Sequence, residues 1–248
     1  MSRAFLNTAA AIPATRKLFH ADPYCTEATG TVIFVHADLV VTDRSVFYAE
    51  SGGQVPDQGT IDGIPVIDVQ KQGGRTARVA NPKVAVPAIS VDTFIVHRLA
   101  QPASFAVGQE VTMKIDWDVR YLHMRYHSAA HFLYHAVRTL LPCDGEGPTT
   151  RGCYIYGEGA RFDYFDPVPA EAIPAIEEFA NEMIRRGHAI RMEAEPDADD
   201  LLYWIYDDVI IPCGGTHVRS AQEVGQISVK RRAKGKNNTR VYCSFKQQ

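Results

Sequence analysis

The sequence lacks any apolar stretch long enough to cross a membrane. A membrane-spanning helix needs about 18 or more consecutive apolar residues, and no segment of this 248-residue chain reaches that length. Residues 1–17 contain a short alanine-rich stretch but not the sustained apolar core of a signal peptide. We therefore interpret them as a loose arm, and we do not expect a membrane or secreted protein.

Cysteine is scarce, and charge of either sign is nearly balanced. The five cysteines are odd in number and scattered, which argues against a disulfide framework and favours a cytoplasmic protein. The net charge of −3 does not indicate a nucleic-acid-binding chain as a whole. Residues 229–240 differ from this average, because they contain six lysines or arginines and no acidic residue. Taken alone, such a run is typical of a solvated hairpin.

The first half of the chain has the pattern of short strands. Apolar stretches such as TVIFVH, LVVTD and TFIVH are separated by Gly, Pro and Asn-Pro turn signals. This pattern predicts a small all-β domain. We place its end near residue 110, which divides the chain into domains of residues 1–110 and 111–248.

The second half begins with a helical period. Asp116 or Asp118 can cap a helix that stops before Pro142. A second helix is predicted from Pro169 to Arg186, followed by HAIRMEAE as a strand. Residues 197–211 fit neither period clearly, whereas QISVKR and TRVYCSF are expected to pair across the basic turn. The second half is therefore α+β.

Four histidines repeat every four residues along the first predicted helix: His123, His127, His131 and His135. Residues four apart share a helix face, so any adjacent pair has the spacing to bind one metal ion. Later, Cys213 and His217 are four apart in IPCGGTHV, where two glycines favour a tight loop. Two imidazoles from the helix and a thiolate and imidazole from the loop suit tetrahedral zinc. The H-E-x-x-H pattern of zinc proteases is absent.

The segment DWDVRYLHMRYHSAAHFL resembles the helix of alanyl-tRNA editing proteins and of the editing domain of alanyl-tRNA synthetase, to which threonyl-tRNA synthetase editing domains are related. In that family an arginine precedes H-[ST]-A-x-H-L by two residues, and Arg125, His127 and His131 occupy these places. The segment CGGTHV matches the second metal motif, whereas His123 and His135 fall outside both motifs. The resemblance implies four zinc ligands: His127, His131, Cys213 and His217.

Two further segments resemble parts of the same family. SVFYAESGGQVPDQGTI is similar to its glycine-rich loop, usually T-x-F-Y-P-x-G-G-G-Q, with Ser45 in place of Thr and Ser51 in place of a Gly. RGCYIYGEGARFDY resembles a stretch that ends in R-[FI]-D-F, although Thr150 stands where synthetase domains commonly have Gln. Together they imply a set of substrate-binding residues: Ser45, Gly52, Gly53, Gln54, Thr150 and Thr216. Ser45 and Thr216 have the alternative of bonding local backbone as turn hydroxyls.

The family resemblance implies a binding partner for the basic segment. GQISVKRRAKGKNNTRVYC is similar to the closing hairpin of the family, which implies contact with the acceptor stem and 3′ end of a tRNA. Phosphate contacts of this kind weaken steeply with salt. The residues expected to make them are Lys230, Arg231, Arg232, Lys234, Lys236 and Arg240.

The resemblance covers residues 15–245 approximately and implies a β-barrel-like N-terminal domain followed by an α+β editing domain. It also implies hydrolysis of mischarged tRNA(Ala), Ser-tRNA(Ala) first and Gly-tRNA(Ala) second, by an editor acting in trans. Zinc would either polarise the ester carbonyl or position the substrate. The alternatives are a zinc-stabilised RNA-binding module without catalysis and a metal-dependent hydrolase of small esters or amides.

Overall fold

The computed structural model describes residues 12–78, 88–141, 147–196, 198–235 and 238–246. In this part of the chain no helix is both long and apolar enough to span a bilayer. The first half contains β1 (Arg16–Lys17), α2 (Leu18–Ala21), β2 (Glu27–His36), β3 (Leu39–Thr42), β4 (Arg44–Ser45), β5 (Gly59–Ile61), β6 (Ile64–Gln72), β7 (Arg75–Arg78), β8 (Ala88–Val91), β9 (Phe94–Leu99) and β10 (Glu110–Ile115). The second half contains α3 (Trp117–Leu140), β11 (Thr150–Tyr156), β12 (Gly159–Tyr164), η1 (Ala170–Ala172), α4 (Ile173–Arg186), β13 (Arg191–Glu195), β14 (Ala198–Tyr206), β15 (Val209–Pro212), η2 (Ala221–Glu223), β16 (Ile227–Ala233) and β17 (Thr239–Phe245).

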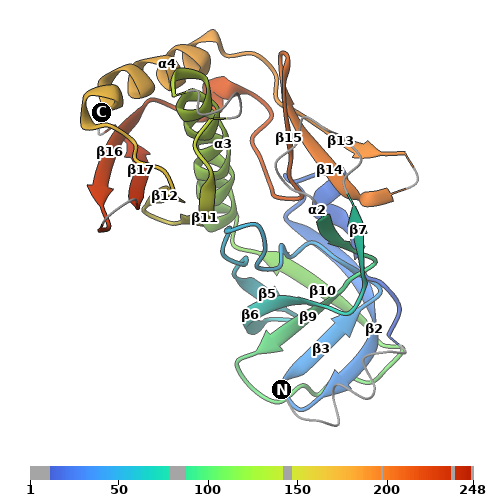
Figure 1. Cartoon of the computed structure of the whole chain (residues 1–248). Helices are drawn as coiled ribbons and strands as arrows, with labels where there is room; N and C mark the ends of the chain where they lie inside the picture. The colour runs from blue at the N-terminus through green and yellow to red at the C-terminus, as the bar shows by residue number, and fades with distance from the viewer. Residues whose placement is uncertain (1–11, 79–87, 142–146, 197, 236–237, 247–248) are drawn as a thin grey trace.

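Six strands of the first half form a closed barrel in the order β10-β2-β3-β9-β6-β5 (Figure 1). Side chains alternate between its two surfaces, as the period of a strand requires. In β10, for example, Val111, Met113 and Ile115 are buried, whereas the residues between them are exposed. The inward-facing residues build a hydrophobic core that also includes Phe47 and Tyr48 from the loop after β4.

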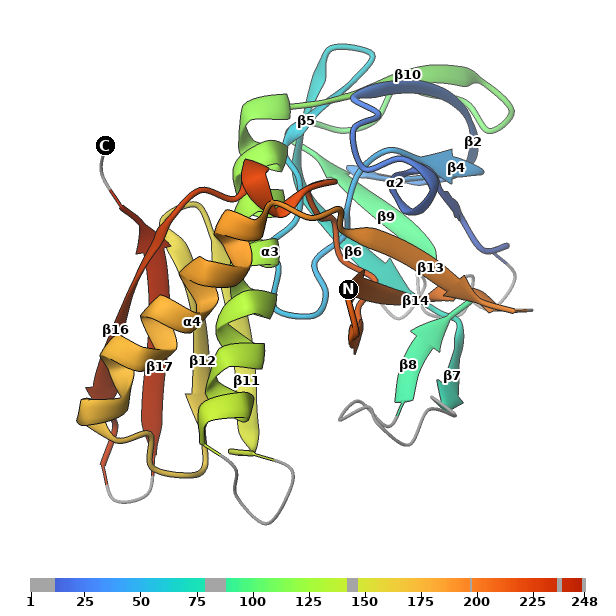
Figure 2. The same ribbon diagram turned by 90° about the horizontal axis from the view of Figure 1, so that it is seen from above.

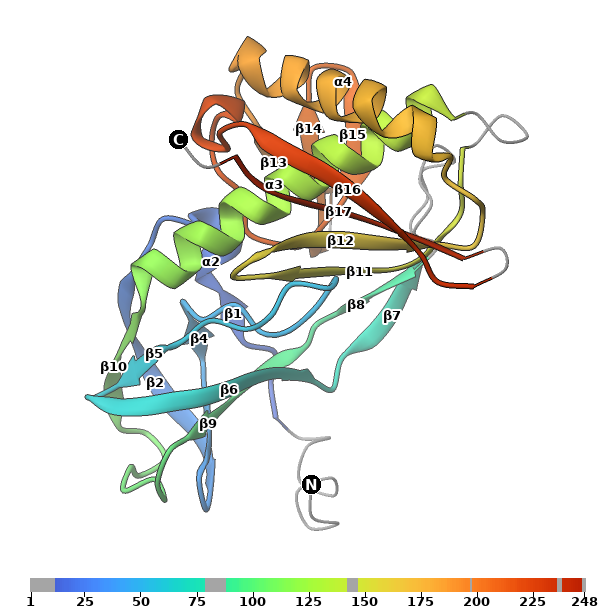
Figure 3. The same cartoon turned by 90° about the vertical axis from the view of Figure 1, so that its left-hand side faces the viewer.

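The second half places two helices on one face of the four-stranded antiparallel sheet β11-β12-β17-β16. Figure 2 shows α3 and α4 side by side, and Figure 3 shows them stacked over the strands. Asp116 caps α3 by accepting a hydrogen bond of 3.2 Å from the Val119 amide. Gly187 ends α4 in the left-handed region with φ of 67°. The two predicted helices and the predicted pairing of β16 with β17 are confirmed.

A third sheet, β13-β14-β15, comes from the segment whose pattern was ambiguous. The hairpin between β14 and β15 turns at Asp207, which has φ of 52°. Trp204 and Tyr206 belong to the core of the second half, whereas Leu201 and Tyr203 form a separate small cluster with Ile89 of β8. Both faces of β14 are thus apolar, which hides the alternation expected of a strand.

The described part of the chain is α+β, as predicted. The interpretation of residues 1–17 as a loose arm is wrong for its last residues, while residues 1–11 lie outside the described part. Lys17 is 8% exposed, and its Nζ lies 2.7 Å from the Asp200 carboxylate of β14. Thr15 is also buried and donates to the Thr42 carbonyl over 3.1 Å. Residues 15–17 are held in place because Thr15 bonds to β3 of the barrel and Lys17 bonds to β14 of the third sheet.

A buried ion pair joins the barrel loop to α3. The Arg120 side chain is fully buried, and its Nε lies 2.8 Å from Oδ1 of Asp57. Its other nitrogens donate to the carbonyl oxygens of Val46 and Pro23 over 2.7 and 2.9 Å. Asp57 in turn accepts a hydrogen bond of 2.6 Å from the Tyr48 amide. The loop that contains the glycine-rich motif is therefore anchored to the first turn of the helix that carries the histidines.

Candidate metal centre

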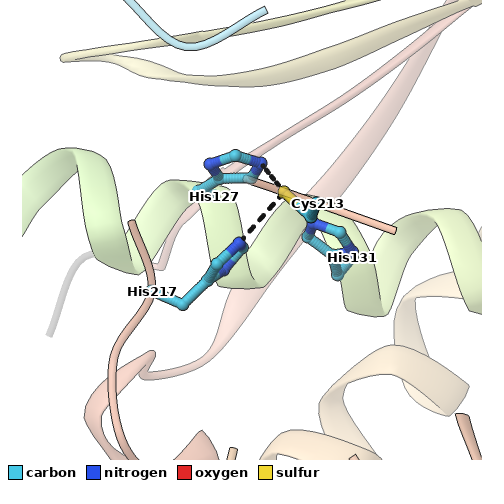
Figure 4. A group of neighbouring side chains, drawn as sticks. All are labelled: His127, His131, Cys213 and His217. Carbon is cyan, nitrogen blue, oxygen red and sulfur yellow. Dashed lines mark hydrogen bonds between the residues drawn. The ribbon is translucent and has the colours of Figure 1, made fainter. Parts of the chain in front are cut away.

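Three imidazoles and one thiol converge where α3 meets the loop after β15. The candidate ligand atoms of His127, His131, Cys213 and His217 all lie within 4.8 Å of one another. Figure 4 shows the two helix histidines and the two loop residues pointing toward a common centre. The Cys213 Sγ is 3.3 Å from Nε2 of both His127 and His217. This group of nitrogen and sulfur donors can hold a metal ion.

The outer nitrogens of two rings are held by hydrogen bonds. Nδ1 of His127 lies 2.7 Å from Oε1 of Gln54, an oxygen that can only accept. Nδ1 of His217 lies 3.1 Å from Oγ of Ser128, whose own proton goes to the Met124 carbonyl. Both rings therefore donate from Nδ1 and keep the Nε2 lone pair directed at Cys213. With the proton held on Nδ1, the Nε2 lone pair of each ring is free to bind a metal ion.

Burial sets the protonation of the cluster. Desolvation, with a smaller contribution from His123, lowers the pKa of His127 to about 3, and desolvation likewise lowers the pKa of His131 and His217. The three rings are thus neutral near pH 7, which is the form that ligates metals. Burial raises the pKa of Cys213 to about 11, opposed by the Gly215 amide and by Lys71. A metal ion that binds there must displace the thiol proton.

The glycine-rich loop completes one side of the cluster. Gln54 is fully buried, and besides holding His127 it donates from Nε2 to the Thr216 hydroxyl over 2.9 Å. The Ile155 amide donates to the Gly53 carbonyl over 2.7 Å, which attaches the loop to β11. Gly53 has φ of 85°, and a Cβ there would overlap the backbone of Cys153. Only glycine permits this approach of the two backbones.

Gly215 is predicted to be irreplaceable for a similar reason. A Cβ at this position would overlap the ring of His127, which is buried and already held by Gln54. We expect Gly215→Ala to displace that ring and to weaken metal binding by roughly 10–100-fold, the effect of losing an outer hydrogen-bond partner of a ligand. Competition with a chelating dye measures this affinity.

Gly157→Ala is the matched control for that substitution. A Cβ at Gly157 meets no atom nearer than 4.0 Å, and we expect its metal affinity to equal that of the wild type. Unchanged affinity in Gly215→Ala would show that His127 has room to move without leaving the centre.

The other residues expected to bind substrate are placed differently. Ser45 is fully buried in the barrel, where its Oγ lies 2.8 Å from Nε2 of His97 and accepts from the Phe47 amide. These contacts favour the alternative of a structural hydroxyl. Thr150 begins β11 opposite Tyr164. Gly52 has φ of 58° with open space where a Cβ would be. Of the predicted set, Gln54 contacts His127 directly, and Thr216 contacts Gln54.

The predicted tRNA-binding residues lie on the hairpin β16–β17, except Lys236, which is outside the described residues. Lys230, Arg232 and Lys234 are exposed and Arg231 is partly buried. Arg240 has a double hydrogen bond to the Asp163 carboxylate at 2.7 and 2.8 Å, and this contact lowers the pKa of Asp163. The pair lines a small cavity, and the residues around it are Arg151, Gly152, Asp163, Lys234, Asn238 and Arg240.

Several residues around the centre have no identifying signal in the sequence. Ser128 orients His217, yet in the sequence it is only the variable Ser or Thr of the histidine motif. Lys71 and His20 come from the barrel side and belong to no motif. Lys71 lies in β6 and His20 in α2, and no local pattern marks either position.

Comparisons with known proteins agree with this arrangement. The model of the family described as "Threonyl and Alanyl tRNA synthetase second additional domain" matches residues 202–242. The chain is 33% identical to the alanyl-tRNA editing protein AlaX-M of Pyrococcus horikoshii over 230 residues, covering 92% of this chain and 96% of that protein.

Longer relatives match over the same part of the chain. The alanine–tRNA ligases of Ignicoccus hospitalis and Pyrococcus furiosus are 32% and 30% identical to it. The matches cover 88% and 89% of this chain but only 24% of each ligase. Sequence similarity over nearly its whole length to an editing protein of similar size thus places the chain in a family. It belongs to the family of alanyl-tRNA editing proteins.

Proposed function

We propose that this chain hydrolyses the ester bond of mischarged tRNA(Ala), with Ser-tRNA(Ala) as the preferred substrate and Gly-tRNA(Ala) as a second one. The observation that carries the proposal is the convergence of His127, His131, Cys213 and His217 in a member of the alanyl-tRNA editing family. It acts in trans on tRNA that a synthetase has already charged, because the family relative of similar length is named as an editing protein.

We propose zinc as the metal and the four clustered residues as its ligands. Tetrahedral zinc with bonds of about 2.3 Å to sulfur and about 2.0–2.1 Å to nitrogen holds these atoms about 3.5 Å apart. The Sγ–Nε2 distances of 3.3 Å to His127 and His217 are close to that value. When bound, the ion supplies a positive charge that polarises or positions the aminoacyl ester.

Side chains beside the metal centre would then select the amino acid whose ester is hydrolysed. Thr216 is fully buried beside Gln54, and the two residues offer polar atoms that a substrate hydroxyl can meet. A site that hydrogen-bonds a hydroxyl rejects the analogue lacking it by about 10⁴–10⁵-fold. Such a site would spare Ala-tRNA(Ala) and would favour serine over glycine, which also lacks the hydroxyl, while an alanine-activating pocket excludes serine only by about 10²-fold. The preference for serine thus follows from the pairing of buried polar groups.

The tRNA is held, in this proposal, by the basic hairpin and the glycine-rich loop. Lys230, Arg232 and Lys234 are exposed and form no ion pair among the described residues, although the charge of Lys234 contributes to the lowered pKa of Asp163. Each phosphate contact releases counterions, so binding should weaken as salt rises. We further propose that the two halves are separate domains, with their boundary near residue 116 rather than near residue 110, because β10 (Glu110–Ile115) belongs to the barrel. The barrel ends with Ile115, and the two large hydrophobic clusters lie on either side of that point.

Deacylation of Ser-tRNA(Ala), Gly-tRNA(Ala) and Ala-tRNA(Ala) by the zinc-loaded protein tests the proposal. We expect release of serine to exceed release of alanine by at least about 10²-fold, because only serine satisfies the polar site. Binding of the same tRNAs is measured in parallel. Tight binding without release of any amino acid would identify an RNA-binding module, and equal cleavage of simple serine esters would identify a hydrolase of small esters.

A further inference from the structure

Cys213 is the most exposed of the four residues of the candidate metal centre. His127, His131 and His217 are buried, whereas Cys213 is partly exposed. The next residue, Gly214, is also partly exposed, and a Cβ there would lie 3.9 Å from Nε2 of His20. A substrate that reaches the cluster therefore arrives past Cys213 and Gly214, along the side bordered by α2 and the end of β6.

Lys71 lies on this side and is directed toward it by the register of β6. Val69 is fully buried in the barrel core, and Lys71 follows it on the same face of the strand. Its Nζ is 5.9 Å from the centre of the Tyr48 ring, which belongs to the loop that carries Gln54. The side chain is partly buried, and no hydrogen bond or ion pair of its Nζ is found among the described residues.

The positive charge of Lys71 is not neutralised by its surroundings. The carboxylate whose charge acts on Lys71, Asp200, already accepts hydrogen bonds from Lys17 at 2.7 Å and from the Asp92 amide at 2.8 Å. Burial, followed by the charge of Lys17, lowers the pKa of Lys71 to about 8. Burial and Lys71 itself lower the pKa of His20 to about 3, so that ring adds no charge. One cation without a partner thus stands beside the route to Cys213.

An unpaired ammonium in a partly buried place is unfavourable unless something compensates it. The Tyr48 ring is near the outer limit of about 6 Å for a cation–π contact, so it provides only weak compensation. An anion brought by the ligand would provide more, because a phosphate is a strong partner for the lysine point charge.

We propose that Lys71 binds the 5′-phosphate of the terminal nucleotide whose 2′- or 3′-ester is presented to the metal centre. This inference rests on the proposed function, since it assumes an aminoacylated nucleotide as ligand. The phosphate and the ester are attached to the same ribose, so a single sugar ring separates them. The charge of Lys71 acts on Cys213, so this cation is suited to hold one end of that sugar while the cluster receives the other.

Two small substrates isolate this contact: 3′-O-seryladenosine with and without a 5′-phosphate. The wild type is expected to hydrolyse the phosphorylated compound with a kcat/KM about 10–100-fold higher, the value of a charge-assisted hydrogen bond. Lys71→Met preserves the apolar stem but removes the charge, and we expect the ratio of its kcat/KM values for the phosphorylated and unphosphorylated compounds to fall to about 1. Lys71→Arg should retain most of the preference. Lys114→Met, an exposed lysine of β10, is the control and should behave as the wild type.

Equal loss of Lys71→Met activity on both compounds would overturn the proposal, since it would place the lysine at the ester or in the fold. A wild type indifferent to the phosphate would overturn it as well. If the wild type hydrolyses neither compound, deacylation of Ser-tRNA(Ala) tests the proposed function separately, and equilibrium binding of AMP and adenosine tests the Lys71 contact. Tighter AMP binding that Lys71→Met abolishes supports the phosphate contact, and equal binding of both ligands refutes it. Zinc content and melting temperature show that the variants are folded.

Discussion

Cys213→Ala is expected to abolish stoichiometric zinc binding and editing together. The thiol is the only sulfur donor in the cluster, and it contacts two of the three imidazoles at 3.3 Å. Its removal leaves three neutral nitrogens that no anionic ligand balances. We expect the metal affinity to fall by more than the roughly 10–100-fold caused by losing an outer partner. Deacylation of Ser-tRNA(Ala) should fall by about 10²-fold or more, as when one preorganised group is removed from an active site.

Metal analysis of the purified variant and a deacylation assay with added zinc measure both effects. Cys25→Ala serves as the control, because Cys25 is also a partly exposed free cysteine but lies outside the cluster. That control should keep one zinc per chain and full activity. A Cys213→Ala protein that retains one tightly bound zinc would show that Cys213 is not a ligand.

Asp57→Asn is expected to produce the largest loss of stability. The substitution keeps the shape of the side chain but leaves the Arg120 guanidinium charged and fully buried beside a neutral amide. Removing one partner of a buried ion pair costs about 3–5 kcal/mol. Urea-induced unfolding of proteins with identical metal content measures the change as a shift of the midpoint.

Two further variants separate the buried charge from other effects. Asp118→Asn changes an exposed acidic residue of the same helix and should alter the free energy of unfolding by no more than about 0.5 kcal/mol. The double variant Asp57→Asn with Arg120→Met removes both charges, so it should be more stable than Asp57→Asn alone. A single variant as stable as the wild type would mean that water or another acid compensates Arg120.

Periodic features of this chain were predictable, because local sequence determines them. The cap at Asp116, the end of α3 before Pro142 and the left-handed Gly187 each follow from the conformational preferences of one or two residues. The pairing of β16 with β17 is similarly local. By contrast, β14 was ambiguous because both of its faces pack against apolar partners, so its residues do not alternate.

The candidate centre was partly predictable for a related reason. The spacing of His127 from His131 and of Cys213 from His217 is a local property, whereas the choice of pairs depended on the family resemblance. Ser45 matched the family's loop by position, but in the fold its hydroxyl faces His97 inside the barrel. Lys71 could not be found in advance, because its nearness to Cys213 depends on how the barrel meets the third sheet.

The wide separation of the clustered residues along the chain has a consequence for biosynthesis. Cys213 and His127 are 86 residues apart, and Gln54 is 162 residues from Thr216. A ribosome must therefore complete the barrel and α3 well before the remaining donors emerge. Until then only His127 and His131 are available as ligands, so the nascent chain binds zinc weakly. Zinc would therefore bind late in biosynthesis, only after the C-terminal segments have docked onto the barrel and α3.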